Sequence, residues 1–241
     1  MEYKYIAPVN WTIPQDTIQK VRLLDPIVMQ DNNDLNKNPL YKQVGILFKQ
    51  DNVEFPVTLT DPFTGEQAII TQEIYNELKH RYDNFKTVLG MDWSPFRLNW
   101  IRNELQDEIL SFLPNELKAL NPRVSRQTKL SEGNSTPVHR DYHRSATLFY
   151  LLDQTDDVTS WWEITEPFTE YNFWLWGDVT KMKKVKSVQI QAGQWYLFDV
   201  NKYHSVEAGA ELKNRNSLCI EFYNPTQADD IYQIFKDLNL I

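Results

Sequence analysis

The chain has 241 residues, of which 41% are hydrophobic and 13% aromatic, so it can bury a large core and is neither disordered nor fibrous. Its formal net charge of −8 disfavours nucleic acid as a partner, because proteins that bind nucleic acid usually carry a basic surface. The length fits one domain, residues 1–241, with elaborations better than two equal domains.

The cysteine content and the apolar segments bear on the cellular compartment. Cys219 is the single cysteine, which excludes an internal disulfide and fits a reducing cytosol. We expect it to be a buried structural thiol. The N-terminal residues hold no apolar stretch of signal-peptide length, and no segment approaches the run of about 20 apolar residues that a membrane span requires. We therefore expect a cytoplasmic protein without a membrane partner, and the sequence leaves its oligomeric state open.

The first half of the chain, residues 1–122, is predicted to hold short strands and supporting helices. Residues 1–30 contain three prolines among short apolar pieces, which favours extended segments broken by turns over a long helix. Residues 31–39 are dominated by Asn and Asp and are predicted to form a surface loop, with a mobile lid as the alternative. Apolar residues then alternate over 44–48 and again over 53–59, which predicts a hairpin or two neighbouring strands.

A helix is predicted after this hairpin. Apolar residues recur at helical spacing over residues 74–89, while Thr71 can cap the start and Gly90 can end the helix. His80 lies off the apolar stripe, so we expect it at the surface.

A second helix is predicted to follow directly. Ser94-Pro95 is a cap followed by a proline, the apolar stripe runs over residues 98–112, and Pro114 ends it. We expect both helices to pack on the outside of a sheet core.

Beyond Pro122 the pattern is that of strands separated by turn residues. The predicted strands are residues 124–130, 145–152, 158–164, 185–191, 194–199 and 215–223. This density, preceded by helices, predicts a mainly β fold with α: a double-stranded β-helix, or jelly-roll barrel of cupin type, over residues 123–224. Residues 225–241 are expected to form a C-terminal helix or tail. The lysine-rich segment 181–186 is interpreted as a solvated strand edge.

A histidine and a carboxylate stand two residues apart at His139 and Asp141. In an extended strand side chains alternate, so these two point to the same side. His204 can supply a third ligand from residues 193–206, which read as strand, turn and strand. Two histidines and one carboxylate bind one face of an iron(II) ion and leave the other face open. The sequence therefore predicts a metal site made of these three residues.

Arg215 and Ser217 stand on the polar face of the last predicted strand. Leu218, Ile220 and Phe222 alternate with them, so the guanidinium and the hydroxyl lie side by side opposite the apolar face. Arginine offers a rigid fork of donors and serine one more, which suits a carboxylate.

His139-x-Asp141, His204 and Arg215-x-Ser217, in this order, resemble the non-haem iron(II), 2-oxoglutarate-dependent oxygenases. The resemblance covers roughly residues 124–223 and implies the same jelly-roll fold. It implies that the three predicted ligands hold Fe(II) and that 2-oxoglutarate binds the metal through its keto-acid end. The far carboxylate of 2-oxoglutarate would then lie on Arg215 and Ser217.

The implied reaction is hydroxylation of an unactivated C–H bond, with conversion of 2-oxoglutarate and O2 to succinate and CO2. A carboxylate at Asp141 favours hydroxylation over halogenation, because related halogenases leave that ligand position to halide. The protein's part in such chemistry is to position and shield the reactants.

Five further side chains are candidates for contacts with cosubstrate or substrate. Tyr150 and Tyr196 are candidates to donate a hydrogen bond to 2-oxoglutarate, and strand parity does not choose between them. Arg144, His143 and Trp162 are candidates for contact with the substrate, and His143 also has the parity to replace a predicted metal ligand. Most of the other aromatic side chains are expected in the core.

A second hypothesis from a different class is a cupin-like barrel that binds a metal or a sugar without oxygenase chemistry. Such a barrel has no need of the carboxylate clamp at Arg215 and Ser217. Under the first hypothesis the substrate, a small molecule or a peptidyl side chain, stays open, because loops determine specificity in such barrels.

Overall fold

The computed structural model describes residues 5–24, 40–62, 64–89, 96–101, 104–129, 135–141, 144–211, 213–223 and 226–241. The predicted loop at 31–39, Gly90, Ser94-Pro95 and His143 lie outside these residues. Among the described residues, no helix is both long and apolar enough to cross a membrane.

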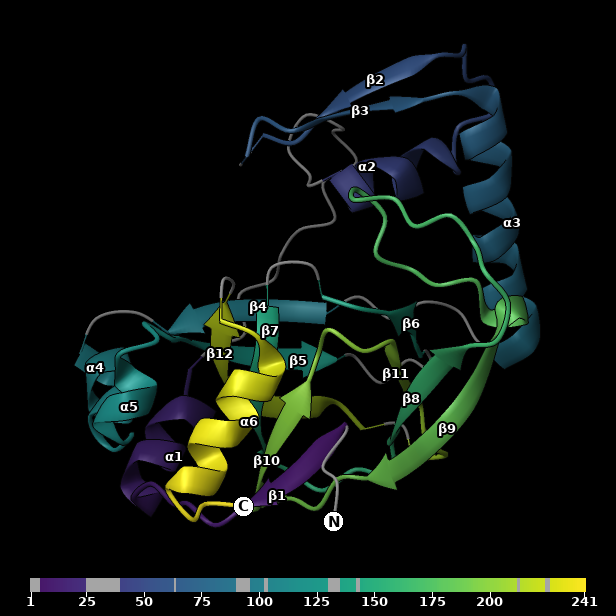
Figure 1. Ribbon diagram of the computed structural model, residues 1–241. Coiled ribbons are helices and arrows are strands. Elements are labelled where there is room, and N and C mark those ends of the chain that lie inside the picture. Colours follow the sequence, from purple (N-terminus) through teal and green to yellow (C-terminus); the bar gives the residue numbers. More distant parts are fainter. Residues whose placement is uncertain are drawn as a thin grey trace.

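Two antiparallel sheets form the body of the described chain (Figure 1). The six-stranded sheet has the order β1-β10-β7-β12-β5-β4 and the four-stranded sheet the order β6-β11-β8-β9. The strands of the first are β1 (Ile6–Val9), β4 (Phe96–Ile101), β5 (Arg123–Lys129), β7 (Arg144–Leu151), β10 (Trp195–Asp199) and β12 (Arg215–Tyr223). Those of the second are β6 (Thr136–His139), β8 (Val158–Ile164), β9 (Met182–Gln189) and β11 (His204–Glu207). This is the predicted jelly-roll fold of cupin type, and each strand predicted beyond Pro122 is confirmed.

The two faces of the six-stranded sheet bury different kinds of side chain. On β12, Leu218, Ile220 and Phe222 belong to the larger apolar core, while Cys219 belongs to a second cluster with residues of both sheets. Because side chains alternate along a strand, Arg215 and Ser217 share the barrel-facing side with Cys219. The predicted alternation along this strand is therefore confirmed.

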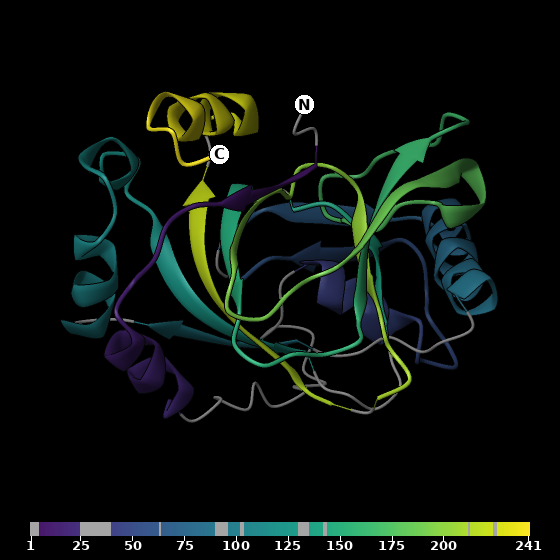
Figure 2. The same cartoon turned by 90° about the horizontal axis from the view of Figure 1, so that it is seen from below.

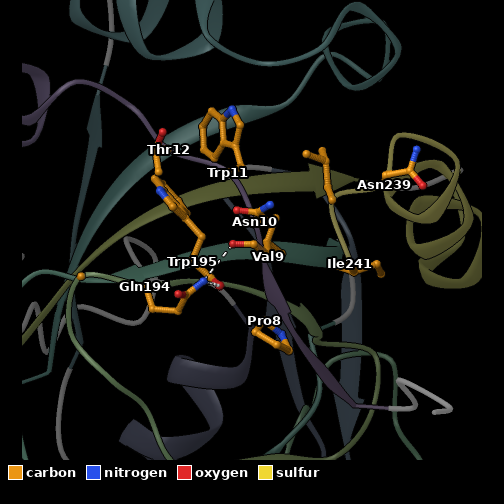
Figure 3. A pocket seen from close by; sticks show the side chains of 11 residues that line it. Pro8, Val9, Asn10, Trp11, Thr12, Gln194, Trp195, Asn239 and Ile241 are labelled. Carbon is orange, nitrogen blue, oxygen red and sulfur yellow. Dashed lines mark hydrogen bonds between the residues drawn. The ribbon is translucent and has the colours of Figure 1, made fainter.

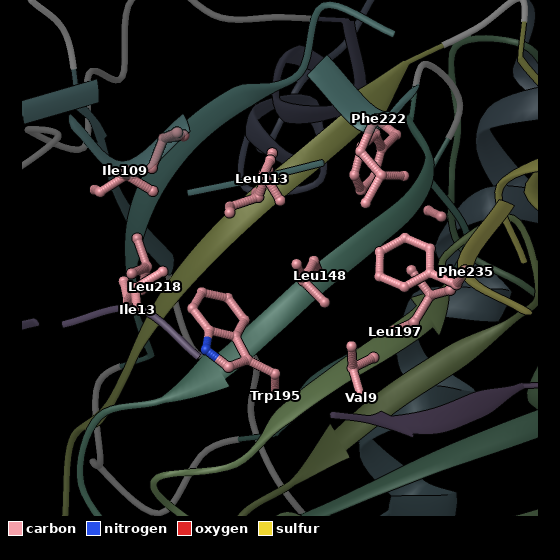
Figure 4. Packing of buried hydrophobic residues seen from close by; sticks show 14 of the residues in the cluster. Val9, Ile13, Ile109, Leu113, Leu148, Trp195, Leu197, Leu218, Phe222 and Phe235 are labelled. Carbon is pink, nitrogen blue, oxygen red and sulfur yellow. The ribbon is translucent and has the colours of Figure 1, made fainter. Parts of the chain in front are cut away.

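Four helices cover the outer face of the six-stranded sheet (Figures 1 and 2). They are α1 (Gln15–Arg22), α4 (Glu104–Ser111), α5 (Asn115–Lys118) and α6 (Ala228–Asp237). Figure 4 shows the core between them and the sheet, with Ile109, Leu113 and Phe235 from the helical side meeting Leu148 and Trp195 from the strands. The barrel-facing side of the sheet is thus free to carry polar groups.

A separate lobe follows α1 in the chain and has its own apolar cluster. It consists of α2 (Leu40–Leu47), the hairpin β2 (Val57–Thr60) and β3 (Gln67–Ile70), and α3 (Gln72–Leu89). Trp174, from the segment after β8, packs into the same cluster. In Figure 1 this lobe lies above the barrel, whereas the four sheet-covering helices lie at its lower left. The short 3-10 helix η2 (Val179–Lys181) precedes β9 and contacts α3.

Two elements of the first half differ from the prediction. Residues 44–48 are not a strand but the end of α2, because Leu40, Val44 and Leu47 bury one helical face in the lobe. The hairpin lies further on, at β2 and β3. Residues 96–101 are not helical but form β4, which pairs along β5, and the helix before Pro114 is only α4.

Other predictions of the first half are confirmed. Thr71 Oγ1 accepts a hydrogen bond from Ile74 N at 3.3 Å at the start of α3, and His80 is exposed. However, α3 packs in the lobe and not on the outside of the sheet. Lys183 and Lys184 are exposed on β9, the edge strand of its sheet, as expected for the lysine-rich segment.

Candidate functional site

The three predicted metal ligands come together at one end of the barrel. His139 ends β6, His204 begins β11, and the two are direct partners in the antiparallel register. Their ring centres are 4.4 Å apart. Asp141 follows β6, and its Oδ1 lies 4.0 Å from His139 Nε2. Sheet pairing thus unites residues that are far apart in the sequence.

Both imidazoles are oriented by backbone carbonyls. His139 Nδ1 is 2.8 Å from Pro137 O, and His204 Nδ1 is 2.9 Å from Lys202 O. A carbonyl oxygen only accepts, so each Nδ1 donates and each Nε2 keeps its lone pair. Burial and the neighbouring His139 lower the pKa of His204 to about 4, so that it is neutral near pH 7.

The carboxylate of Asp141 divides its two oxygens between the histidines and an arginine. Oδ1 faces His139, whereas Oδ2 lies 2.7 Å from Arg144 Nη2. Burial raises the pKa of Asp141, but Arg144 and the two histidines outweigh it and hold the pKa below its usual range. A monodentate ligand whose second oxygen is held by another side chain is a common arrangement around metals.

The donor set fits an iron(II) ion in its chemistry. Two imidazoles and one carboxylate are, when deprotonated, a donor set of the kind that leaves coordination positions open. Among the described residues, however, no group of three His, Cys, Asp or Glu side chains is already arranged to hold a metal ion. The predicted residues therefore have the donors and their supports, while the coordination geometry is not preformed.

Arg215 buries its guanidinium in the barrel, where no carboxylate of the described residues forms a salt bridge with it, although the Asp157 carboxylate is near enough to raise its pKa. The residue is 4% exposed, Nη2 donates to Thr159 Oγ1 at 3.0 Å, and the guanidinium carbon is 5.0 Å from the Phe149 ring centre. Nη1 is buried and has no hydrogen-bond partner in the described part of the chain. Burial lowers the pKa of Arg215 to about 10, so it remains a cation at neutral pH.

A second buried cation stands beside Arg215. Lys129 is its partner in the β5–β12 register and is 1% exposed. Lys129 Nζ lies 3.1 Å from Asp157 Oδ2, and Asp157 Oδ1 accepts a hydrogen bond from Gly209 N. Lys129 and Arg215 thus share this part of the barrel with Asp157, and Asp156 also acts on the charge of Lys129.

Both His204 and Arg215 contact strand β8, so their positions can be compared along that strand. His204 pairs with Trp161 on β8, and Arg215 bonds to Thr159, two residues earlier on the same strand. Two residues of a strand span ~7 Å, so Thr159 and the register partner of His204 are about that far apart along β8.

The other predicted cofactor residues lie on different faces. Ser217 Oγ bonds to Gln127 O at 3.4 Å and is 3.7 Å from Cys219 Sγ. Tyr196 packs against the barrel-facing cluster, whereas Tyr150 packs on Trp195 in the core under the helices. Of the two tyrosines, the structure brings only Tyr196 to the face that carries Arg215.

Cys219 is buried and free, as expected for a structural thiol. Burial raises the pKa of its thiol to about 12, so the thiolate is not populated at neutral pH.

The predicted substrate residues have partners of their own. Besides Asp141, Arg144 Nη1 lies 2.9 Å from Glu221 Oε1, so its guanidinium joins two carboxylates. Trp162 donates from Nε1 to Ser205 Oγ at 2.9 Å and packs outside the barrel-facing cluster. Their roles toward a substrate stay predictions.

Sequence reasoning missed three residues of the barrel interior: Trp161, Lys129 and Glu221. Glu221 is 1% exposed and also accepts hydrogen bonds from Ser125 and Gln127. Its parity on β12 matches that of Arg215, which was an available signal. Trp161 and Lys129 become visible only through their registers with His204 and Arg215.

A cavity of about 390 Å³ lies elsewhere, where β1, the turn before β10 and the C-terminal residues meet (Figure 3). Gln194 Nε2 donates to Val9 O at 2.8 Å across it. Its lining residues include Asn10, Trp11 and Asn239 but none of the predicted site residues. Its side chains offer no acid, base or metal ligand, so we place the candidate site in the barrel.

No family model matches the chain, and no curated protein matches it. Solved structures with a similar fold include vicilin from Corylus avellana (hazelnut), at 15% identity and a TM-score of 0.31, with 53% of this chain and 29% of that chain covered. The non-heme alpha ketoglutarate dependent carbocyclase SnoK matches at 14% identity and a TM-score of 0.38, covering 68% of this chain and 82% of that chain. AviO1 from Streptomyces viridochromogenes Tue57 matches at 13% identity and a TM-score of 0.39, covering 92% and 91%. The chain spans less than a third of the vicilin, and at these TM-scores the likeness carries no argument about function.

Proposed function

We propose that this protein is an iron(II)- and 2-oxoglutarate-dependent oxygenase of the cytoplasm that hydroxylates an unactivated C–H bond of a small molecule or a peptidyl side chain. The observation that carries the proposal is the buried guanidinium of Arg215: its Nη1 has no hydrogen-bond partner in the described part of the chain, and its Nη2 bonds to Thr159, which lies ~7 Å along β8 from the register partner of His204. A buried cation without a counter-ion is costly, and a ligand carboxylate would offset that cost.

Each residue of the site has a part in the proposal. His139, His204 and Asp141 would hold the iron, with Nδ1 of each histidine anchored to the backbone and Asp141 steadied by Arg144. When bound, iron(II) and 2-oxoglutarate would supply the activation of O2. The chain itself binds the far carboxylate at Arg215 and excludes water through the aromatic residues of the barrel-facing cluster.

An anaerobic titration tests this function. Iron(II) followed by 2-oxoglutarate should give a visible charge-transfer band that requires both additions, and air should then release succinate. Asp141→Ala should lose the band, because one of three ligands is missing. An Asp141→Ala variant that still formed succinate from 2-oxoglutarate would contradict the ligand assignment.

The second candidate is a cupin-like barrel that binds a metal or a sugar without oxygenase chemistry, and its sugar-binding form needs no group of three metal-binding side chains, of which the described residues hold none. If this candidate is right, the addition of 2-oxoglutarate produces no visible absorption band, whether or not the protein binds iron(II). The same titration therefore separates the two candidates.

A further inference from the structure

Trp161 lies in the barrel beside the candidate site and has no assigned role. It is 0% exposed on β8 and is the register partner of His204 on β11. Register partners in an antiparallel pair project to the same side of the sheet. Trp161 therefore shares the barrel interior with the histidines.

The aromatic contacts of Trp161 connect it to the surroundings of Arg215. Its ring meets Phe198 edge-on, with centres 5.6 Å apart and planes at 80°. Phe198 stacks on Phe149 at 4.9 Å, and Phe149 carries the Arg215 guanidinium at 5.0 Å. The indole and the guanidinium thus border the same cluster of rings.

The indole N–H of Trp161 is buried and has no hydrogen-bond partner in the described part of the chain. Buried indole N–H groups usually find an acceptor, as Trp162 does in Ser205. Arg215 Nη1 is likewise a buried donor without a partner among the described residues. The other terminal nitrogen of Arg215, Nη2, donates to Thr159, which lies two residues before Trp161 on β8. The indole N–H of Trp161 and Nη1 of Arg215 are therefore two donors beside the same cluster of rings in the barrel.

We propose that the indole N–H of Trp161 donates a hydrogen bond to a carboxylate oxygen of the dicarboxylate that Arg215 binds. This inference rests on the proposed function, and it names a positioning contact beyond the arginine and serine. A carboxylate accepts at up to about four lone-pair positions, so the fork of Arg215 leaves acceptor capacity for an indole.

Trp161→Phe is the direct test, because it keeps an aromatic ring and removes the donor. The matched control is Trp174→Phe: Trp174 Nε1 is also buried without a partner among the described residues, but its ring packs in the lobe cluster and not in the barrel-facing cluster that holds Trp161. The dissociation constant of 2-oxoglutarate is measured by calorimetry on the full chain with manganese(II) added in place of iron(II). We expect Trp161→Phe to weaken binding about tenfold or more and Trp174→Phe to leave it within about twofold.

A second measurement keeps the test valid should Trp161→Phe fold poorly. In the zinc-loaded wild type, 2-oxoglutarate should move the Trp161 indole N–H proton resonance downfield and slow its exchange with water, while the Trp174 resonance stays in place. The inference would be overturned by a Trp161 resonance that does not move, or by equal 2-oxoglutarate affinity in wild type and Trp161→Phe. The indole of Trp161 would then serve only its packing against Phe198. Wild-type protein that binds no 2-oxoglutarate would instead overturn the proposed function, and the inference with it.

Discussion

Arg215 carries its charge where a folded protein seldom leaves one uncompensated. Its described contacts are a neutral hydroxyl at Thr159 and the face of Phe149, and neither neutralises a cation. Arg144 differs from Arg215, since Arg144 is partly buried and joins two carboxylates, Asp141 and Glu221. Arg144 is thus paired within the chain, and the absence of such a pair for Arg215 among the described residues supports the proposal that Arg215 binds a ligand.

Arg215→Met should therefore separate stability from ligand response. Removing the unpaired charge should raise the free energy of unfolding of the ligand-free protein by roughly 1–3 kcal/mol, in line with the lowered pKa of Arg215. The same change should abolish stabilisation by 2-oxoglutarate, because the carboxylate loses its fork of donors. Urea denaturation with and without 2-oxoglutarate measures both effects.

Arg22→Met provides the control for that experiment. Arg22 pairs with Asp153 near the surface of the molecule, so its loss should change stability little and leave the response to 2-oxoglutarate intact. A destabilised Arg215→Met protein that kept its response would show that the guanidinium serves the fold and not a ligand.

Residues whose chemistry depends on local spacing could be predicted from the sequence. His139 and Asp141 were paired by strand alternation alone, and Arg215 and Ser217 by the same rule. Trp161 could not be assigned over Trp162, because neighbours on a strand face opposite sides and only the register with His204 shows which one is inside.

At the scale of elements, a buried ion pair links β5 to a segment outside its own sheet. Lys129 on β5 reaches Asp157 in the segment before β8, and both side chains are nearly inaccessible to solvent. This pair ties the six-stranded sheet to the segment that leads into the four-stranded sheet. Because each charge is desolvated, the pair matters chiefly through the penalty for breaking it.

Asp157→Ala should destabilise the protein by about 3–5 kcal/mol, since it leaves Lys129 buried without a counter-ion. The double variant Lys129→Met with Asp157→Ala should recover much of that loss, because no charge is then stranded. Thermal and urea unfolding of the single and double variants measure the coupling. Equal stability of single and double variants would mean that water reaches Lys129 when its partner is removed.

The elements that were mispredicted show where local patterns are ambiguous. Residues 40–48 alternate in hydrophobicity and also carry apolar residues at helical spacing, and burial of Leu40, Val44 and Leu47 in the lobe selects the helix. Residues 96–100 fit a helical stripe when joined to the residues after them, yet they alternate apolar and polar types by themselves. Pairing with β5, a contact distant in sequence, decides for the strand.

For the whole molecule, the jelly roll places its largest apolar core outside the barrel, between the six-stranded sheet and four helices. The lobe is fastened to the barrel from the other side: Arg81 on α3 donates to Thr169 O, and Trp176 pairs with His139 through an isolated bridge. Apolar clusters under the four helices and in the lobe therefore lie on either side of the barrel. The free energy that they contribute to folding offsets the desolvation of the charged side chains inside the barrel.

The contact between the barrel and α6 makes global stability depend on pH through Asp199. Asp199 ends β10 and is 4% exposed, and burial raises its pKa to about 6, with nearby Asp229 adding to the rise and Lys202 opposing it. Between pH 4 and pH 6 the folded protein holds a proton that the unfolded chain releases. This carboxyl therefore contributes stability below pH 4 that is lost as the pH rises through 6, on the order of 1–3 kcal/mol.

Asp199→Asn should remove that dependence. The amide keeps an oxygen to accept the hydrogen bond from Asn201 N and carries no charge above pH 6, so the variant should be more stable than wild type at pH 7.5 and nearly equal to it at pH 3.5. Urea unfolding at the two pH values gives the difference between variant and wild type, in which the other titrating groups cancel. If the difference in the free energy of unfolding were the same at both pH values, a group other than Asp199 would take up the proton. If the variant were less stable than wild type at pH 7.5, the ionised carboxylate of Asp199 would be stabilised where the sheet meets α6.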